Sequence, residues 1–500
     1  MRRTHLLAAS LIVATAATGL ALPANAAKDD TKGSPFAVGA PGAGDPYFPF
    51  IGNGGFDVQH YDLKLTYTPP KPAPAPLTGR LDAVAKITMR ATQSLDRFNL
   101  DLRGLDVKGV RVGKKPAKEV SPPGNSNVGG SVYWQTQNDA NRKWELTIQP
   151  RPKIKRGQVF TVTIHYGGAT TRPTDIEGVL YGWVTTRDGA MVVNEPEGAM
   201  TWYPVSDHPT DKATYSYAIT VPKGKTAVAN GLPSREPVTA DGWTTWYWDA
   251  PDAMASYLST ASIGDFVLTE STTSSGVPII DAVDSKLSPP DAEATARALA
   301  QQDAIITFFE DNFRAYPFNS AGAIVDDNSV GYALETQTRP VYSGFATTGT
   351  VAHELAHQWF GNAVSPGRWS DIWLNEGWAT YLTWMWREER GRATVQSQFE
   401  DIMAIPRRSG FWDVVVADPG ATGLFHSAIY NRGAATLQAL RLTVGDKAFF
   451  AGARLWLQRY DDATGTTDDF QAVYEETSGR NLDAFFDTWV WTPDKPAVAG

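Results

Sequence analysis

One short segment of the chain carries the pattern H-E-x-x-H, whose residue types can hold and use a metal ion. Two histidines four residues apart lie on one face of a helix, so His353 and His357 can both reach one zinc ion. Glu354 would then stand beside the metal as a candidate general base. A catalytic zinc takes three protein ligands, so a third His or carboxylate must come from elsewhere. Glu376 is the candidate, in a second helix predicted over residues 370–390. Without a metal, the histidines would be ordinary groups on an amphipathic core helix.

The sequence that follows the pattern is the strongest functional signal in the chain. The run HELAHQWFGNAVSPGRWSDIWLNEGWATYL resembles the aminopeptidase N family of gluzincin zinc metallopeptidases. This resemblance implies one Zn²⁺ per chain, held by His353, His357 and Glu376, with Glu354 assisting attack by a zinc-bound water on the peptide bond. The later run IYNRGA is similar to the family's Tyr-x-Lys-Gly-Ala segment, which implies that Tyr430 stabilises the oxyanion.

Two further segments resemble the parts of the family that bind the substrate's free amino group. The run NEPEG places Glu195 on the family's acidic residue, and the run YALET places Ala333 and Glu335 where the family has Gly-Ala-Met-Glu-Asn. A free α-amine is largely cationic at neutral pH, with a pKa of about 8, so carboxylates suit it. The family's Glu seven residues after the glutamate ligand is Thr383 here, which leaves Asp371 as a possible partner of a zinc histidine.

Composition places the chain among globular proteins. Its 500 residues suffice for two or three domains, and 42% hydrophobic with 20% charged residues is typical of folded chains. A formal net charge of −9 without a basic cluster argues against nucleic acid as a partner. The absence of cysteine excludes a thiol nucleophile and thiolate metal ligands.

The N-terminus has the pattern of a secretory signal peptide. Arg2 and Arg3 precede an apolar run over residues 6–22, and an A-x-A site ends at Ala26. We therefore expect a signal peptide over residues 1–26, a mature chain from Ala27 and a secreted protein. A membrane anchor is the alternative, which the short apolar run disfavours. The pattern does not choose between the general and the twin-arginine export routes.

Hydrophobic periodicity predicts an α+β protein with a β-rich part before a mainly helical part. Residues 27–49 are expected to form a loose leader, and residues 50–252 show period-two runs at 81–89, 98–102, 144–148 and 159–166. From about residue 255 the chain is predicted to be mainly helical, with one long helix over residues 289–313. By resemblance, these are a saddle-like β-sandwich (50–252) and a thermolysin-like catalytic domain (253–500), without the further C-terminal domains of larger members.

Three functions fit these residues. The first is a secreted, monomeric zinc aminopeptidase acting on peptides with a free N-terminus, with no membrane anchor after processing. The second is a zinc endopeptidase that has the same metal site but no amine clamp, and Glu195 and Glu335 separate it from the first. The third is a non-catalytic protein that binds zinc or peptides, which would not need Glu354 or Tyr430.

Overall fold

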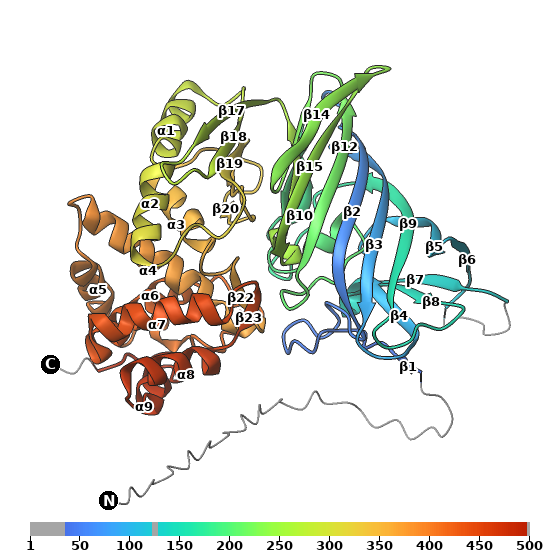
Figure 1. Ribbon diagram of the computed structural model, residues 1–500. Coiled ribbons are helices and arrows are strands. Elements are labelled where there is room, and N and C mark those ends of the chain that lie inside the picture. Colours follow the sequence, from blue (N-terminus) through green and yellow to red (C-terminus); the bar gives the residue numbers. More distant parts are fainter. Residues whose placement is uncertain (1–35, 123–128, 498–500) are drawn as a thin grey trace, which may run out of the picture. The chain divides into compact units, whose positions relative to one another are not determined.

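A computed structural model describes residues 36–122 and 129–497 (Figure 1). The predicted signal peptide and the first part of the predicted leader, up to residue 35, lie outside the described residues. Strands dominate up to residue 264, and helices dominate after residue 348 (Figure 1). The predicted α+β class, with a β-rich domain before a mainly helical one, is confirmed.

The β-rich part is built on a twelve-stranded sheet. Along β3, buried and exposed residues alternate strictly, which is the period-two pattern expected of a strand with one face on a core. The predicted runs at 81–89, 144–148 and 159–166 lie within β3, β8 and β9, and the run at 98–102 overlaps β4. In spatial order the strands are β1 (Ala37–Val38), β4 (Leu95–Asp101), β8 (Lys143–Gln149), β7 (Val132–Asn138), β6 (Lys115–Glu119), β5 (Asp106–Val112), β9 (Val159–Thr170), β3 (Gly79–Ala91), β2 (Phe56–Thr68), β12 (Ala213–Pro222), β15 (Trp243–Met254) and β14 (Leu232–Ala240).

A second, four-stranded sheet is buried throughout. Its strands, in spatial order, are β10 (Gly182–Thr185), β11 (Ala190–Val193), β16 (Ala261–Gly264) and β13 (Thr226–Ala229). The domain boundary predicted between residues 252 and 253 falls inside β15, and β16 still pairs with β11 and β13. We therefore propose that the change of domain follows Gly264.

The second part begins with a sheet rather than with helices, which corrects the prediction that the chain is mainly helical from about residue 255. Its five strands, in spatial order, are β17 (Phe266–Thr272), β18 (Pro278–Asp284), β19 (Ala321–Asp326), β21 (Val341–Ser343) and β20 (Ala333–Leu334). Strand β17 was not predicted from the sequence because it lies at the edge of the sheet. Glu270 and Ser271 are exposed there, so the alternation of apolar and polar residues is short.

Helices follow in close succession. They are α1 (Pro289–Leu299), α2 (Gln302–Asn312), α3 (Thr348–His357), α4 (Trp373–Glu389), α5 (Val395–Met403), α6 (Ser427–Val444), α7 (Asp446–Arg459), α8 (Thr467–Ser478) and α9 (Asp483–Phe486). Two short strands, β22 (Val364–Pro366) and β23 (Ala463–Gly465), pair in parallel among them.

The prediction of one long helix over residues 289–313 is wrong in one respect, because the segment forms two helices, α1 and α2. The backbone turns at Ala300 and Gln301, where the Gln301 N–H donates to the Ala298 carbonyl instead of continuing the helical pattern. The turn brings buried Gln302 against β18, where its amide donates to both carboxylate oxygens of Asp281 at 3.0 Å.

The second part of the predicted loose leader is also wrong, because residues 36–49 pack against the core. Phe48 is buried, and the carboxylate of buried Asp45 accepts hydrogen bonds from the backbone N–H of Trp369 at 2.8 Å and of Tyr47 at 2.8 Å. A polar loop with one buried carboxylate and one buried aromatic ring has no periodicity, so the sequence could not reveal this packing.

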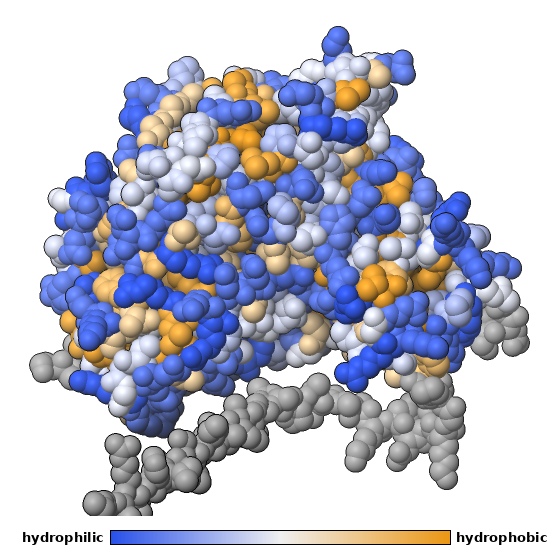
Figure 2. Space-filling view, viewed as in Figure 1, coloured by the Kyte–Doolittle hydropathy of each residue, from blue (hydrophilic) through white to orange (hydrophobic). Residues whose placement is uncertain are grey.

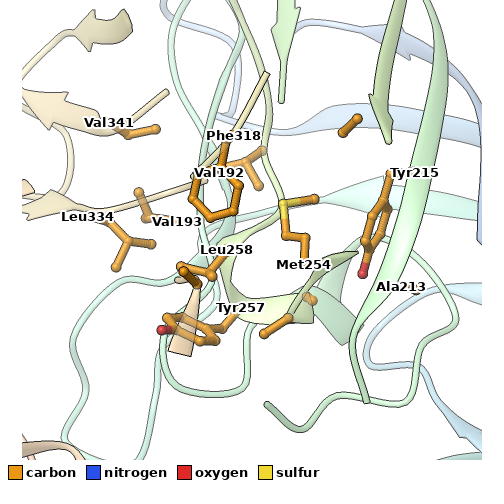
Figure 3. Close-up of a cluster of buried hydrophobic side chains, with 14 of the residues drawn as sticks. Val192, Val193, Ala213, Tyr215, Met254, Tyr257, Leu258, Phe318, Leu334 and Val341 are labelled. Atoms are coloured by element: carbon orange, nitrogen blue, oxygen red, sulfur yellow. The ribbon is translucent and has the colours of Figure 1, made fainter. Parts of the chain in front are cut away.

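One buried apolar cluster contains residues from both parts of the chain (Figure 3). Val192 and Val193 of β11 and Tyr257 and Leu258 after β15 lie in the same cluster as Leu334 of β20 (Figure 3). The two segments that resembled substrate-binding motifs, after β11 and after β20, therefore start from a common core.

The face of the molecule in Figure 2 is largely hydrophilic, with apolar residues in separate groups. Among the described helices, none has the length and apolar character needed to span a bilayer.

Candidate functional site

Helix α3 presents both histidines of the H-E-x-x-H pattern to one point. Thr347 caps the helix, accepting from the Thr350 N–H while the Thr350 side chain accepts from the Thr347 N–H. Four residues of helix then place His353 and His357 on one face, with their Nε2 atoms 3.2 Å apart. The prediction that the two imidazoles share one face is confirmed.

Glu376 reaches the same point from the first turn of α4. Its Oε2 atom lies 3.0 Å from Nε2 of His353 and 3.3 Å from Nε2 of His357. Burial alone would raise the pKa of this carboxyl, but the neighbouring imidazoles lower it to about 2. Burial would likewise lower the pKa of His357, and the carboxylates of Glu335 and Glu376 raise it to about 10. The pocket thus favours positive charge at this point.

The spacing of these three atoms fits a zinc ion. Ligand atoms at 2.0–2.2 Å from a tetrahedral zinc are about 3.3–3.6 Å apart. The three observed separations, 3.0, 3.2 and 3.3 Å, are at or slightly below this range, and the donor set of two imidazoles and one carboxylate is one that catalytic zinc uses. Nδ1 of His357 donates to the Phe360 carbonyl at 3.2 Å, which leaves the Nε2 lone pair for a metal.

Asp371, considered from the sequence as a partner of a zinc histidine, is engaged elsewhere. Its buried carboxylate accepts from the N–H and hydroxyl of Thr467, at 3.0 and 2.7 Å, and from Arg368 at 3.2 Å. These hydrogen bonds connect the segment before α4, which contains Asp371, to the start of α8. Thr383 donates to the Ala379 carbonyl within its own helix. The backbone carbonyl of Phe360 is the His357 partner, and no side-chain pattern could have revealed it.

Glu354 lies next to the metal cluster with its side chain buried. Carboxylate oxygens of Glu354 and Glu335 and a ring nitrogen of His357 lie within 4.8 Å of one another. Burial raises the pKa of Glu354 well above its usual range, and the neighbouring carboxylates of Glu335 and Glu376 add to this, against the lowering effect of His357. Glu354 therefore lies beside His357, and its role as the general base stays a prediction.

Glu195 and Glu335 converge on the same cavity from the two parts of the chain. Glu195 is 8% exposed and Glu335 is 2% exposed, and Oε1 of each accepts no hydrogen bond from any described residue. Burial and the mutual repulsion of the two carboxylates raise the pKa of Glu195 well above its usual range. Two buried carboxylates with free oxygens form a site that a cation would complete.

Hydrogen bonds fix the backbone around both glutamates. Asn194, beside Glu195, donates to the Ser259 carbonyl and accepts from the indole N–H of Trp202. The carbonyl of Glu335 accepts from the amides of Gln358 at 3.2 Å and Asn362 at 2.8 Å. Since Gln358 and Asn362 directly follow α3, the position of Glu335 is tied to the helix that carries the histidines.

Tyr430 approaches the cluster from the first turn of α6. Its ring lies nearly parallel to that of His353, with the ring centroids 6.1 Å apart. Burial and then the carboxylate of Glu376 raise the pKa of this phenol, so it keeps its proton. Arg432, two residues on, is fully buried and donates to five backbone carbonyls, which anchors the start of α6.

These residues line one cavity of about 300 Å³. All the residues predicted as metal ligands, catalytic groups or substrate-binding groups line this cavity, including Ala333, two residues before Glu335. Sequence reasoning missed Asp175, Glu177, Val179, Tyr332 and Phe425, which also line it. The first three belong to the turn PTDIEGV, which has the composition of an ordinary loop, so no periodic signal could have found them.

Comparison with known proteins identifies the family. Residues 58–258 match the peptidase M1 N-terminal domain, and residues 322–489 match the peptidase family M1 domain. The chain belongs to peptidase family M1. Zinc is therefore the cofactor of this chain, as the donor set and its spacing independently indicate.

Curated relatives and solved structures agree with this placement. The chain is 27% identical to aminopeptidase A of Gloydius brevicauda over 86% of its own length, and 28% identical to glutamyl aminopeptidase of Mus musculus over 68%. It spans 46% and 38% of those two proteins. The M1 zinc metallopeptidase of Deinococcus radiodurans superimposes with a TM-score of 0.78 over 92% of this chain and 99% of that one, at 23% identity, which supports the fold.

Proposed function

We propose that this chain is a zinc aminopeptidase that removes the first residue from peptides. One observation carries the proposal: Glu195 and Glu335, two buried carboxylates with free oxygens, share a cavity with His353, His357 and Glu376. The metal site alone would fit an aminopeptidase and an endopeptidase equally well. A paired carboxylate site within the same small cavity fits a substrate whose amino group is free.

His353, His357 and Glu376 would hold the ion. When bound, zinc supplies Lewis acidity to the scissile carbonyl and to the attacking water. Glu354 accepts a proton from that water and passes it to the leaving amine, a role that its place beside His357 supports. The protonated hydroxyl of Tyr430 donates a hydrogen bond to the oxyanion that develops on the substrate.

Glu195 and Glu335 bind the α-ammonium group and so set the distance from the N-terminus to the scissile bond. Hydrogen bonds to charged groups contribute about 1.5–3 kcal/mol each. An acetylated N-terminus carries no charge and leaves both buried carboxylates unpaired, so internal peptide bonds are disfavoured. This argument favours an aminopeptidase over an endopeptidase with the same metal site.

Several relatives are named glutamyl aminopeptidase, and we do not extend that preference to this chain. An acidic first residue needs a cation or strong donors near its side chain. Neither Lys nor Arg is among the described residues that line the cavity. Export through a signal peptide over residues 1–26 remains a prediction from the sequence.

The decisive experiment compares free and blocked substrates. Aminoacyl p-nitroanilides are assayed with the zinc-loaded enzyme, each beside its N-acetylated counterpart. We expect hydrolysis of the free substrates only. In Glu335→Ala, kcat/KM for the free substrates falls and the gap to the acetylated ones narrows. Equal cleavage of both forms, or products cut at internal bonds, would establish the endopeptidase. Zinc binding without any cleavage would establish a binding protein.

A further inference from the structure

An acidic turn from the β-rich part borders the cavity and has no place in the chemistry described above. It runs from Thr174 to Leu180, which form an antiparallel bridge. One oxygen of Asp175 accepts from the backbone N–H of Glu177 and of Val179, both at 2.9 Å. This arrangement fixes the shape of the turn and leaves the second Asp175 oxygen and the whole Glu177 carboxylate available.

The turn is held in place from both ends. The Thr174 carbonyl accepts from Arg103 at 3.0 Å, and the Leu180 carbonyl accepts from the hydroxyl of Tyr332 at 2.7 Å. Tyr332 precedes Ala333 and Glu335, so it joins the turn directly to the segment that carries the amine-binding carboxylate. The acidic turn is therefore a fixed part of the wall.

Asp175, Glu195 and Tyr332 line the same cavity. Burial raises the pKa of the Tyr332 phenol, and the negative charges of Glu195 and Asp175 raise it further. A substrate whose amino group meets Glu195 would have the side chain of its first residue near this phenol and the turn.

The charge on the cavity wall is strongly one-sided. Its lining includes Asp175, Glu177, Glu195, Glu335, Glu354 and Glu376. The last four have roles in the proposed function. Glu376 holds the metal, Glu354 transfers the proton, and Glu195 and Glu335 bind the α-ammonium group. Asp175 and Glu177 are additional, and no Lys or Arg among the described lining residues neutralises them.

We infer that Asp175 and Glu177 bind the side chain of the substrate's first residue and make the enzyme prefer peptides that begin with lysine or arginine. This inference rests on the proposed aminopeptidase activity, whose substrate class it specifies. A guanidinium or ammonium group pairs with carboxylates through charge-assisted hydrogen bonds, whereas an apolar side chain gains nothing from them and an acidic one is repelled.

The test uses pairs of substrates that differ in charge and little in shape. p-Nitroanilides of arginine and citrulline form one pair, and those of lysine and norleucine form the other. We expect kcat/KM to favour the charged member of each pair by on the order of tenfold, with the preference shrinking at high ionic strength. A glutamate substrate should be the poorest of the set.

Variants assign the preference to the turn. Asp175→Asn keeps an oxygen that accepts from Glu177 and Val179, so the turn is preserved while its charge is removed. The double variant Asp175→Asn, Glu177→Gln should lose most of the preference for charged substrates, so that its kcat/KM for the lysine substrate approaches that for norleucine. Glu236→Gln, at an exposed position in β14, is the matched control and should keep the full preference. Thermal melting confirms that each variant is folded.

The outcomes separate the two proposals. Hydrolysis of free substrates with equal rates for arginine and citrulline, or a double variant that keeps the full preference, would overturn the role of the turn and leave the aminopeptidase intact. No hydrolysis of any free substrate by the zinc-loaded enzyme would overturn both.

Discussion

A methyl group on Gly433 would lie 2.9 Å from the Cα atom of Gly377, so α4 and α6 meet at a point where neither helix has room for a side chain. Gly377 directly follows the metal-binding Glu376, and Gly433 comes one helical turn after Tyr430. The contact of these two glycines therefore sets the distance between the third zinc ligand and the hydroxyl proposed to stabilise the oxyanion.

Replacing Gly433 by alanine should push α6 away from α4. Overpacking of this kind typically costs about 1–3 kcal/mol of stability. We expect a lower melting temperature together with a fall in kcat, because Tyr430 moves relative to the metal site. Gly109→Ala is the control, since a methyl group there meets no atom within 4 Å. Unchanged kcat in Gly433→Ala would show that the helix contact does not position Tyr430.

The metal site predicts that Glu376→Gln binds zinc far more weakly. The amide keeps the shape of the side chain but removes the negative charge that lies beside the Nε2 atoms of His353 and His357. Zinc content per chain, measured after dialysis against a weak chelator, should fall well below one while the wild-type chain retains its metal. Retention of one zinc by the variant would require a different third ligand.

For Glu354→Gln we expect a folded protein that still binds zinc and turns over substrate about 10²–10⁴-fold more slowly, as for the loss of a positioned general base. Metal analysis and a single-turnover assay on the same preparation separate chemistry from metal loss. Asp371→Asn serves as a comparison, because Asp371 is a buried acid near the site whose contacts are structural. A normal rate in Glu354→Gln would remove this residue from the mechanism.

Tyr430→Phe should lower kcat with little change in KM. The hydroxyl is proposed to donate to an oxygen that becomes charged only in the transition state, and loss of one such donor typically costs about 10²–10³ in kcat. The ring that lies over His353 is retained in phenylalanine, so the packing stays the same. A change confined to KM would instead mean that Tyr430 only contacts the bound substrate.

How much of the fold and of the site could be predicted from the sequence depended on the kind of sequence pattern. Strands such as β3 were predicted because strict alternation reflects burial of one face. His353, His357 and Glu354 were predicted because helical spacing fixes their relative positions before any tertiary contact forms. Glu376 was a candidate from the need for a third zinc ligand, and the resemblance assigned it that role. Glu195, Glu335 and Tyr430 came from the resemblance alone, since their convergence depends on packing between separate elements.

What the sequence did not reveal has physical causes. The Asp175 turn borders the cavity only because Tyr332 and Arg103 hold it there, and such contacts join residues far apart in the chain. Asp45 appeared to belong to a loose leader because a single buried carboxylate in a polar loop has no periodicity. The break between α1 and α2 is likewise a tertiary effect, associated with the contact of Gln302 with Asp281.

The final prediction concerns Asp207, a fully buried carboxyl that binds two neighbouring segments together. It accepts from the backbone N–H of Met200 at 2.9 Å and from the hydroxyl of Ser256 at 2.7 Å. Despite these hydrogen bonds, burial raises its pKa from 3.8 to about 7.

Because the folded pKa exceeds the unfolded one, the folded protein keeps a proton between about pH 4 and pH 7 that the unfolded chain releases. The resulting stabilisation is complete below pH 4 and is lost as the pH rises through 7, by at most about 4 kcal/mol. Asp207→Asn has no titrating group; its oxygen can accept from the Met200 N–H, and its NH2 group can donate to the Ser256 hydroxyl oxygen. Its unfolding free energy should therefore fall less between pH 5 and pH 8 than that of the wild type. Denaturant melts at the two pH values measure the difference, and parallel losses in both proteins would mean that Asp207 is ionised throughout this range.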